Sequence, residues 1–263
     1  MYDSPKDWFP PGVDPSFSGL TIDELNRYLP ALQTQEDLHP DPAQLSEGIY
    51  QAEIRAGLSR LPERTMDLIL IHPPENPVEE IRSVQGAATW QDVYEWHRQW
   101  LKECQRIVKA EGVVALFCSW QSSGMYQSLL SEYFQVPTRI TWRKSLRSQT
   151  RKAGPFLDQI GDIWLGSLAR PLQLEFPEDN PRGNLWADIV DWQGNTETDE
   201  TDLPEQVVER LLRLTTTKLD WVLDPFMGRG IAGVVAKKLG RRYIGLGTSQ
   251  DQCLLAMKRI DQT

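Results

Sequence analysis

The sequence has the length and composition of an ordinary globular protein: 263 residues, 40% hydrophobic and 25% charged, with a net charge of −9. It contains no apolar run of the roughly 18 residues that a membrane helix needs, and the N-terminus lacks the apolar stretch of a signal peptide. Three scattered cysteines predict neither a disulfide scaffold nor a zinc site. We therefore expect a cytoplasmic protein that contacts no membrane and holds no metal.

The N-terminal region differs in composition from the rest of the chain. Residues 1–45 are rich in proline and acids and are expected to form an arm outside a main domain at 46–263. Within this arm only residues 20–29 have a helical pattern. Thr21 and Glu24 have the spacing of a capping box, in which side chains satisfy the first backbone N–H groups of a helix.

After the arm, strands and helices are expected to alternate. The predicted strands are 67–71, 113–118, 136–142, 161–166, 221–223 and 243–246. The predicted helices are 90–108, 121–133, 203–214, 231–239 and 251–260. This alternation predicts an α/β fold with a mostly parallel sheet covered by helices on both faces.

The charge is unevenly distributed. Residues 175–209 contain eleven acids and one cation, whereas residues 138–157 contain six cations and no acid. The six cations are Arg139, Arg143, Lys144, Arg147, Arg151 and Lys152. Such a cluster can neutralise the phosphates of a nucleic acid, although a solvated positive surface is the more common explanation of a charge run.

The most informative segment is Asp224-Pro-Phe-Met-Gly-Arg-Gly230. It follows a predicted strand and precedes a predicted helix, so it lies where α/β proteins bind ligands. Gly228 and Gly230 have no Cβ, and they allow a ligand to approach the backbone closely. The dinucleotide fingerprint G-x-G-x-x-G is absent, which disfavours a nicotinamide-dependent dehydrogenase.

This segment, with the helix and strand that follow it as far as Gly245, resembles the S-adenosylmethionine loop of DNA amino-methyltransferases. The resemblance covers roughly residues 48–262. It implies a Rossmann-like sheet with one antiparallel strand, and methyl transfer from S-adenosylmethionine to N4 of cytosine or N6 of adenine. The residues that it places at the cofactor are Glu53, Asp224, Pro225, Phe226, Gly228, Gly230, Gly247 and Thr248.

A second segment, His72-Pro-Pro-Glu75, is similar to the catalytic strand end of the same family, which is usually Asp or Ser, Pro, Pro and Tyr. There the first side chain and the carbonyl of the first proline accept protons of the target amine. The resemblance therefore makes His72, Pro73, Pro74 and Glu75 the catalytic candidates. Glu75 has no ring on which a flipped base could stack. Trp120 could supply one, although core packing is the more common role of a tryptophan.

The order of the two segments also resembles one class of the family. The catalytic strand precedes the cofactor loop, which is the permuted order of the β class. This implies double-stranded DNA with a flipped base as substrate, residues 138–185 as the DNA-contacting insertion, and a role in restriction–modification. A homodimer or an active methyltransferase partner is a further expectation.

The sequence departs from the family at the cofactor as well. Ile231 replaces the usual Ser or Thr after the second glycine, and Gly247 replaces the acid that binds the ribose. Losing a charge-assisted hydrogen bond weakens binding roughly ten- to a hundredfold. One alternative is therefore a methyltransferase fold without catalysis that binds DNA or regulates a partner. An RNA or small-molecule methyltransferase is another.

Overall fold

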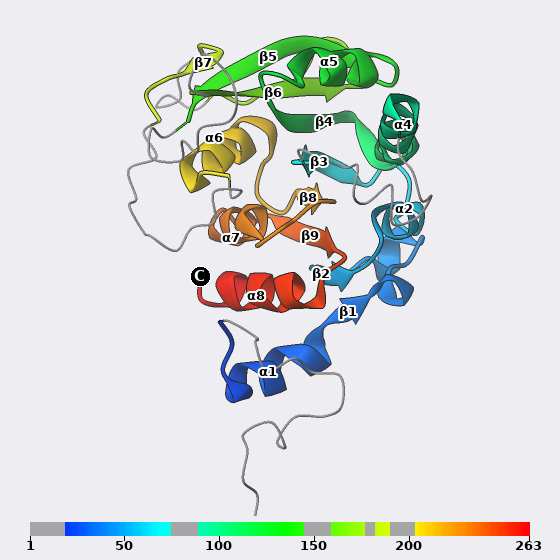
Figure 1. Ribbon diagram of the computed structural model, residues 1–263, viewed down its shortest axis with the longest axis vertical. Helices are drawn as coiled ribbons and strands as arrows, with labels where there is room; N and C mark the ends of the chain where they lie inside the picture. The colour runs from blue at the N-terminus through cyan, green and yellow to red at the C-terminus, as the bar shows by residue number, and fades with distance from the viewer. Residues whose placement is uncertain (1–18, 75–88, 145–158, 177–181, 190–202) are drawn as a thin grey trace, which may run out of the picture.

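One sheet forms the centre of the molecule (Figure 1). The computed structural model describes residues 19–74, 89–144, 159–176, 182–189 and 203–263. Within them the strand order is β1-β2-β9-β8-β3-β4-β6-β5-β7. The strands are β1 (Gln33–Thr34), β2 (Gly48–Gln51), β3 (Met66–Ile71), β4 (Val108–Ser119), β5 (Gln135–Arg143), β6 (Ile160–Ser167), β7 (Leu185–Trp186), β8 (Trp221–Asp224) and β9 (Arg242–Gly247).

The sheet is mostly parallel. Among the described strands, β6 alone runs against its neighbours, pairing antiparallel with β4 and with β5. The remaining pairs are parallel. As a result, the carboxyl ends of β2, β9, β8, β3, β4 and β5 lie along one edge of the sheet, which we call the carboxyl edge. The predicted fold, with a single antiparallel strand, is confirmed.

Helices cover both faces of this sheet (Figure 1). The helices α2 (Ile54–Ser59), α4 (Trp90–Ile107) and α5 (Ser123–Ser131) contribute to one buried cluster, and α6 (Glu205–Thr215), α7 (Ile231–Lys238) and α8 (Gln250–Asp261) to the other. Alternate residues of β3 divide between the two clusters: Leu68 and Leu70 face α6 to α8, while Ile69 and Ile71 face α2, α4 and α5. Each face of the sheet therefore has its own hydrophobic core.

Most predicted elements lie within a few residues of their observed positions, and β4 shows the clearest difference. It begins at Val108, because residues 108–112 form a bulge that shifts the pairing with β3 between Met66 and Leu68. Gly112 permits this close approach, since a Cβ there would lie 2.8 Å from the Met66 carbonyl oxygen. The short elements β1, β2, α2 and β7 were not predicted, because they are too short to show a period.

The described part of the N-terminal region, residues 19–45, packs against the end of the chain. The helix α1 (Ile22–Tyr28) begins with the predicted capping box: the Thr21 N–H donates to Glu24 at 2.8 Å, and the Glu24 N–H donates to Thr21 Oγ1 at 3.2 Å. Lys258 of α8 donates to the carbonyl of Gly19 at 2.8 Å. Three short 3-10 helices follow α1, at Leu29–Ala31, Gln35–Asp37 and Pro42–Gln44.

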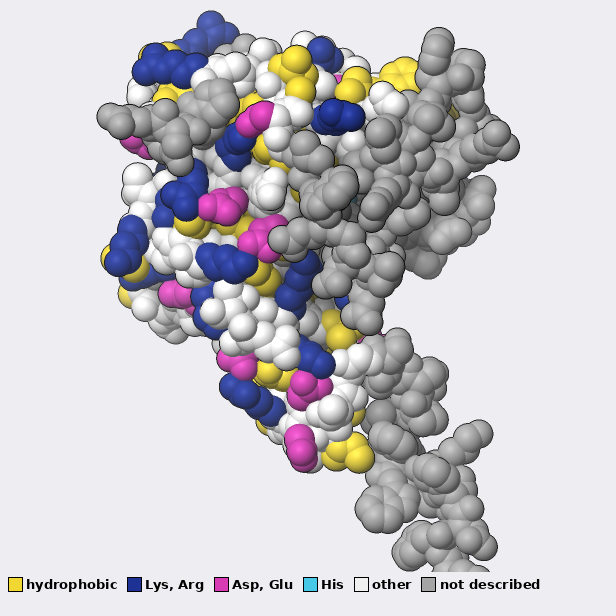
Figure 2. Space-filling model, turned by 90° about the vertical axis from the view of Figure 1, so that its left-hand side faces the viewer, with side chains coloured by type: hydrophobic (Ala, Val, Ile, Leu, Met, Phe, Trp, Pro, Cys, Tyr) yellow, Lys and Arg dark blue, Asp and Glu magenta, His cyan; other side chains and the backbone are white. Residues whose placement is uncertain are grey.

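The face formed by α6, α7 and α8 carries charges of both signs (Figure 2). Several cations there are paired: Lys238 with Glu205 at 2.5 Å, and Arg213 with Glu209 at 2.8 Å. This face is therefore an ordinary solvated surface. Within the described residues, no group of His, Cys, Asp and Glu side chains has the arrangement of a metal site, and no helix is long and apolar enough to cross a bilayer.

Candidate active site at the carboxyl edge

The glycine-containing loop joins β8 to α7 at the carboxyl edge. Gly228 and Gly230 have φ values of +50° and +76°, in the left-handed region that favours glycine. A Cβ at Gly230 would lie 2.8 Å from the Cβ of Ala256, whereas a Cβ at Gly228 would meet nothing within 4 Å. Gly230 thus allows α7 to approach α8, while Gly228 borders open space that a ligand can occupy.

Asp224, the last residue of β8, is an acid in an apolar environment. Its side chain is only 3% exposed, and the Phe226 N–H donates to its Oδ1 at 3.2 Å. Burial raises the pKa of Asp224 to about 7, despite the polar contacts of Phe226 and Tyr243. A carboxyl group in this setting favours a bound positive charge, because a cation offsets the cost of its ionisation.

Tyr243 is a residue of this site that the sequence analysis missed. Its ring lies between two glycines: a Cβ at Gly233 would be 2.7 Å from Tyr243 Cε1, and one at Gly245 would be 2.7 Å from its hydroxyl oxygen. The hydroxyl is buried, and it makes no hydrogen bond of standard geometry with any described residue. Burial is the main reason that the pKa of Tyr243 lies well above its ordinary value, and the charge of the nearby Asp224 raises it further. The alternation of Tyr243 and Gly245 on one face of β9 was the signal that could have revealed it.

Phe226 connects the glycine loop to α4. Its ring centroid lies 5.9 Å from that of Trp96 and 5.3 Å from that of Trp100. The neighbouring His97 is fully buried, with Nδ1 2.6 Å from the Val93 carbonyl oxygen and Nε2 3.0 Å from the Tyr126 hydroxyl. Because a carbonyl only accepts, Nδ1 carries the proton and Nε2 accepts from Tyr126.

Burial lowers the pKa of His97 to about 4, so its ring is neutral at pH 7. It is a buried histidine with a hydrogen-bond partner at each ring nitrogen.

The ends of β2 and β9 bring the remaining cofactor candidates to the same edge. Gln51 pairs with Gly247, and the Ala52 N–H donates to the Gly247 carbonyl at 2.9 Å. Glu53 caps α2 by accepting from the Ala56 N–H at 2.9 Å, and Thr248 is exposed. The Met227 N–H donates to the Leu246 carbonyl at 3.2 Å, which joins the glycine loop to β9. The eight predicted cofactor residues therefore lie on the ends of three adjacent strands.

The catalytic candidates follow β3, the strand next to β8. His72 is half-buried, and its ring centroid is 6.2 Å from that of Phe117 on β4. Pro73 is buried and Pro74 half-buried. Glu75 lies outside the described residues. The pairing of Ile69 with Leu223 places His72 one strand away from Asp224 at the carboxyl edge.

Three of the six predicted DNA-binding cations are described, and they differ in environment. Arg139 is half exposed; its Nη1 lies 3.6 Å from Asp162 Oδ2, and its guanidinium is 5.6 Å from the centroid of Trp164. Arg143 is exposed at the end of β5, and Lys144 follows it. Residues 147, 151 and 152 lie outside the described residues. Arg143 and Lys144 are thus at the carboxyl edge, whereas Arg139 is engaged by a buried acid.

Trp120 does not belong to the core. The sequence analysis preferred core packing for this residue, and that interpretation is wrong, because 52% of the side chain is exposed. The reason is its position: the sheet ends at Ser119, and residues 119–122 form a turn closed by a hydrogen bond from the Ser122 N–H to the Ser119 carbonyl at 3.2 Å. The predicted helix at 121–133 begins only at Ser123 for the same reason.

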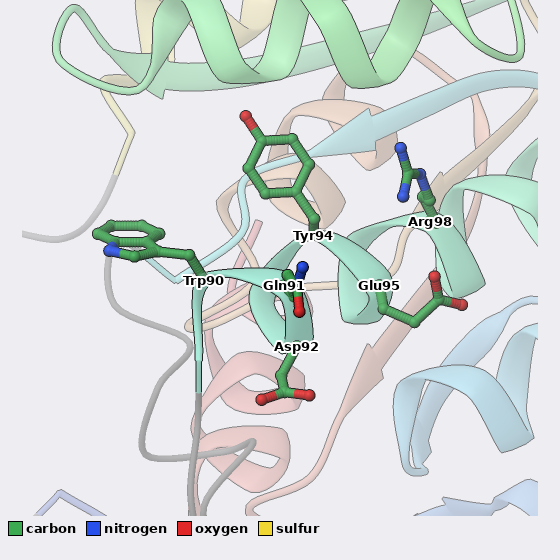
Figure 3. Close-up of a pocket in the computed structure, with 6 residues that line it drawn as sticks. All are labelled: Trp90, Gln91, Asp92, Tyr94, Glu95 and Arg98. Atoms are coloured by element: carbon green, nitrogen blue, oxygen red, sulfur yellow. The ribbon is translucent and has the colours of Figure 1, made fainter.

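A hollow of about 540 Å³ lies on the outer surface of α4 (Figure 3). The described residues that line it belong to this helix: Trp90, Gln91, Asp92, Tyr94, Glu95 and Arg98. Arg98 forms an ion pair with Glu132 at 2.8 Å. Among the residues that the structure describes, none of the predicted site residues lines this hollow.

A Rossmann-like sheet with a glycine loop after β8 and a Pro-Pro strand end after β3 defines a methyltransferase fold with permuted motif order. The DNA methylase family of the N6/N4 type matches residues 66–163 and 158–258, and the chain belongs to this family. It is accordingly a DNA amino-methyltransferase that uses S-adenosylmethionine, and the non-catalytic alternative is not supported.

Individual relatives are similar over most of their length. The type II methyltransferase M2.DpnII of Streptococcus pneumoniae is 25% identical over 254 residues, covering 78% of this chain and 85% of the relative. The PvuII cytosine-N4-specific DNA methyltransferase shares the fold with a TM-score of 0.69 at 17% identity, over 87% of this chain and 88% of that one. The complex of M1.HpyAVI with S-adenosylmethionine has a TM-score of 0.60 at 21% identity, over 81% and 98%.

Proposed function

We propose that this chain methylates an exocyclic amine of a flipped base in double-stranded DNA, with the residues of the carboxyl edge as its active site. One observation carries this proposal. The glycine loop and the His72-Pro73 strand end, far apart in the sequence, lie on the adjacent strands β8 and β3. A methyl donor held by the first would be next to an amine held by the second.

The residues of the loop fit S-adenosylmethionine chemically. The buried carboxyl of Asp224 can bind the ammonium of its methionine part, and the open space at Gly228 leaves room for that part. The helix α7 begins at Ile231, and its N-cap residue Gly230 provides no side-chain cap, so the first N–H groups of the helix can bind a carboxylate. The bound group supplies an electrophilic methyl.

His72 and Pro73 would orient the amine. An exocyclic amine is a poor nucleophile while its lone pair is delocalised into the base. Acceptors at its two protons favour a tetrahedral nitrogen, whose lone pair can attack. The carbonyl of Pro73 can accept one proton, and a neutral His72 imidazole can accept the other. An imidazolium cannot accept a hydrogen bond, so this role requires the neutral ring. Pro74 and Glu75 would border the base.

The cations of residues 138–185 would hold the DNA. Arg143 and Lys144 are at the same edge as His72, and Arg147, Arg151 and Lys152 continue the basic segment. Each contact to a phosphate releases counterions and adds salt-dependent affinity.

The residues after β2 and β9 would bind the other end of the cofactor. Glu53 and Thr248 would lie near its adenosine part. Gly247 leaves this part without the usual acid.

Assembly and compartment complete the proposal. We place residues 46–263 in the methyltransferase domain, with residues 1–45 as an arm, and we expect either a homodimer or a complex with an active methyltransferase. Light scattering of the purified chain measures its oligomeric state directly. The three cysteines are free thiols, which supports a reducing cytoplasm.

The test is transfer of a labelled methyl group from S-adenosylmethionine to unmodified plasmid DNA. His72→Ala should abolish transfer while the affinity for S-adenosylmethionine, measured by calorimetry, stays unchanged. His39→Ala is the matched control, because His39 is exposed in the N-terminal region. Full activity of His72→Ala would remove His72 from the mechanism. A wild-type chain that binds the cofactor but methylates no DNA would contradict the proposed function.

A further inference from the structure

We propose that Trp120 is the residue on which the flipped target base stacks. This inference rests on the proposed function, because only a base taken out of the duplex needs a new stacking surface. The strand end that usually carries an aromatic residue carries Glu75 in this chain. If the chain acts on a flipped base, another ring must take this place.

The position of Trp120 follows from the pairing of β3 with β4. Ile71, the last residue of β3, pairs in parallel with Leu116, and β4 continues three residues further, to Ser119. His72 and Pro73 therefore follow the shorter strand, and Trp120 follows the longer one at the same edge, beyond the level at which β3 ends. Adjacent parallel strands are about 4.8 Å apart. A tryptophan in the turn after β4 can therefore reach the space above the His72-Pro73 strand end.

The turn that carries Trp120 is held firmly. Besides its closing backbone hydrogen bond, the Ser119 and Ser122 hydroxyl oxygens are 3.1 Å apart, and the Ser122 hydroxyl donates to the Ser119 carbonyl at 3.2 Å. The next residue, Ser123, is buried and accepts from Trp164 Nε1 at 2.9 Å. The indole of Trp120 is thus presented from a fixed backbone, which keeps the entropic cost of binding a base low.

The other exposed aromatic rings of the described residues are less suited to this role. Phe176 follows Glu175, which shares a surface hollow with Asp67 and Asp220 at the starts of β3 and β8. That is the opposite edge of the sheet. Trp90 is 77% exposed in the first turn of α4 and lines the hollow on the outer surface of that helix (Figure 3). Trp120, by contrast, directly follows the strand next to His72.

The environment of Trp120 suits a nucleic acid. Arg143 and Lys144 are on β5 and the residue after it, at the same edge of the sheet. Cations at this edge can bind phosphates on either side of the flipped nucleotide, while the ring takes the base. Aromatic rings flanked by cations are the common arrangement for holding an unpaired base.

The experiment compares Trp120→Ala, Trp120→Phe and Trp90→Ala in the full-length chain. Each variant is measured for S-adenosylmethionine affinity by calorimetry and for kcat and KM on unmodified plasmid DNA. Trp120→Ala should lower kcat/KM for DNA roughly ten- to a hundredfold with cofactor affinity unchanged, and Trp120→Phe should restore most of the activity. Trp90→Ala should stay within about threefold of wild type.

The outcomes separate this inference from the proposed function. If the wild-type chain methylates DNA and Trp120→Ala is equally active, Trp120 does not bind the base. A larger loss in Trp90→Ala than in Trp120→Ala assigns the base to α4 and overturns the inference. If Trp120→Phe is as defective as Trp120→Ala, the ring itself is not what matters. If the wild-type chain has no activity, the proposed function fails, and the inference fails with it.

Discussion

The two halves of the sheet differ in strand direction and in the residues that they carry at the carboxyl edge. In the half formed by β2, β9, β8 and β3, all pairs are parallel, and the loops at the carboxyl edge carry the cofactor candidates. The half formed by β4, β6, β5 and β7 contains the reversed strand β6 and carries the exposed Trp120 and the cations of β5. We call them the cofactor half and the target half.

The difference teaches which parts of a site a fold determines by itself. In the cofactor half, glycines with positive φ and a buried acid shape the backbone next to the open space at Gly228. In the target half, polar side chains stand at a sheet edge and at a turn, where the backbone accepts many residue types. Apart from His72 and Pro73 after β3, we therefore expect substitutions in the cofactor half to change stability and cofactor affinity. Those in the target half should change the binding and methylation of DNA and leave cofactor affinity unchanged.

The largest effect is expected for Asp224→Asn. Removing the carboxylate that faces the bound ammonium should weaken S-adenosylmethionine about a hundredfold by calorimetry, with DNA affinity unchanged. Stability should change in the opposite direction. The pKa of Asp224 is about 7 in the folded chain against an ordinary 3.8, so the folded state holds the proton between these values. Wild-type stability therefore falls as the pH rises from about 4 to 7.

The variant lacks this penalty. Without cofactor at pH 8, the free energy of unfolding of Asp224→Asn should exceed that of wild type by up to about 4 kcal/mol in urea titrations. At pH 4 the two proteins should be nearly equal. A variant that is less stable at pH 8, or that binds the cofactor normally, would show that Asp224 is not the buried anion described above.

The two glycines of the loop make a matched pair. Gly230→Ala combines a left-handed backbone with a contact to Ala256, and it should lower the free energy of unfolding by about 2–4 kcal/mol. Gly228→Ala has only the backbone cost, about 1 kcal/mol, but its methyl enters the open space in which we propose that the cofactor binds. Thermal melts and cofactor titrations distinguish them. Equal destabilisation would mean that α7 and α8 are not packed at Gly230.

His97 lies where the two halves meet, since α4 contacts Phe226 of the cofactor loop and Tyr126 of α5. Its pKa is about 4 in the folded chain against an ordinary 6.5, so the unfolded state binds more protons between these values. Wild-type stability should therefore decline as the pH falls from 6.5 to 4, by about 3 kcal/mol from this group. His97→Gln keeps hydrogen-bonding atoms but does not titrate.

Urea titrations between pH 7 and 4 measure this contribution as the difference between wild type and His97→Gln. The control is His39→Gln, which should follow wild type because His39 is exposed. Parallel curves for wild type and His97→Gln would contradict the buried neutral ring.

The same contrast explains what the sequence could predict. Asp224 and the two glycines lie within seven residues, so one local pattern indicated the glycine loop, and the mostly parallel sheet followed from alternating elements. Tyr243 escaped because its role depends on Gly233 and Gly245 of two different elements. Trp120 was misjudged because the local sequence places it between two elements but does not show whether a side chain in such a turn packs inward or faces solvent.

The basic segment shows the remaining limit. The sequence counts Arg139 as equal to Arg143, and only the tertiary fold shows that Arg139 lies beside the buried Asp162, which also accepts from Thr141 Oγ1 at 2.7 Å. That pairing joins β5 to β6, although Arg139 and Asp162 are far apart in the sequence. A pattern of charges along the chain therefore overstates how many of them are available to a ligand.

The smallest effects are expected for these cations, and they complete the contrast between the halves. Arg143→Ala and Lys144→Ala should each weaken DNA binding a few-fold and reduce the slope of log K against log salt by about 0.9, the value for one phosphate contact. Arg139→Ala should change the slope less, because Asp162 already neutralises part of its charge. None of the three substitutions should alter S-adenosylmethionine affinity.

Binding titrations on one duplex between 50 and 200 mM salt measure these slopes, because the effect of a phosphate contact is clearly resolved over this interval. If Arg139→Ala reduced the slope as much as Arg143→Ala, the ion pair with Asp162 would have to open when DNA binds. The target half would then rearrange on binding, unlike the cofactor half.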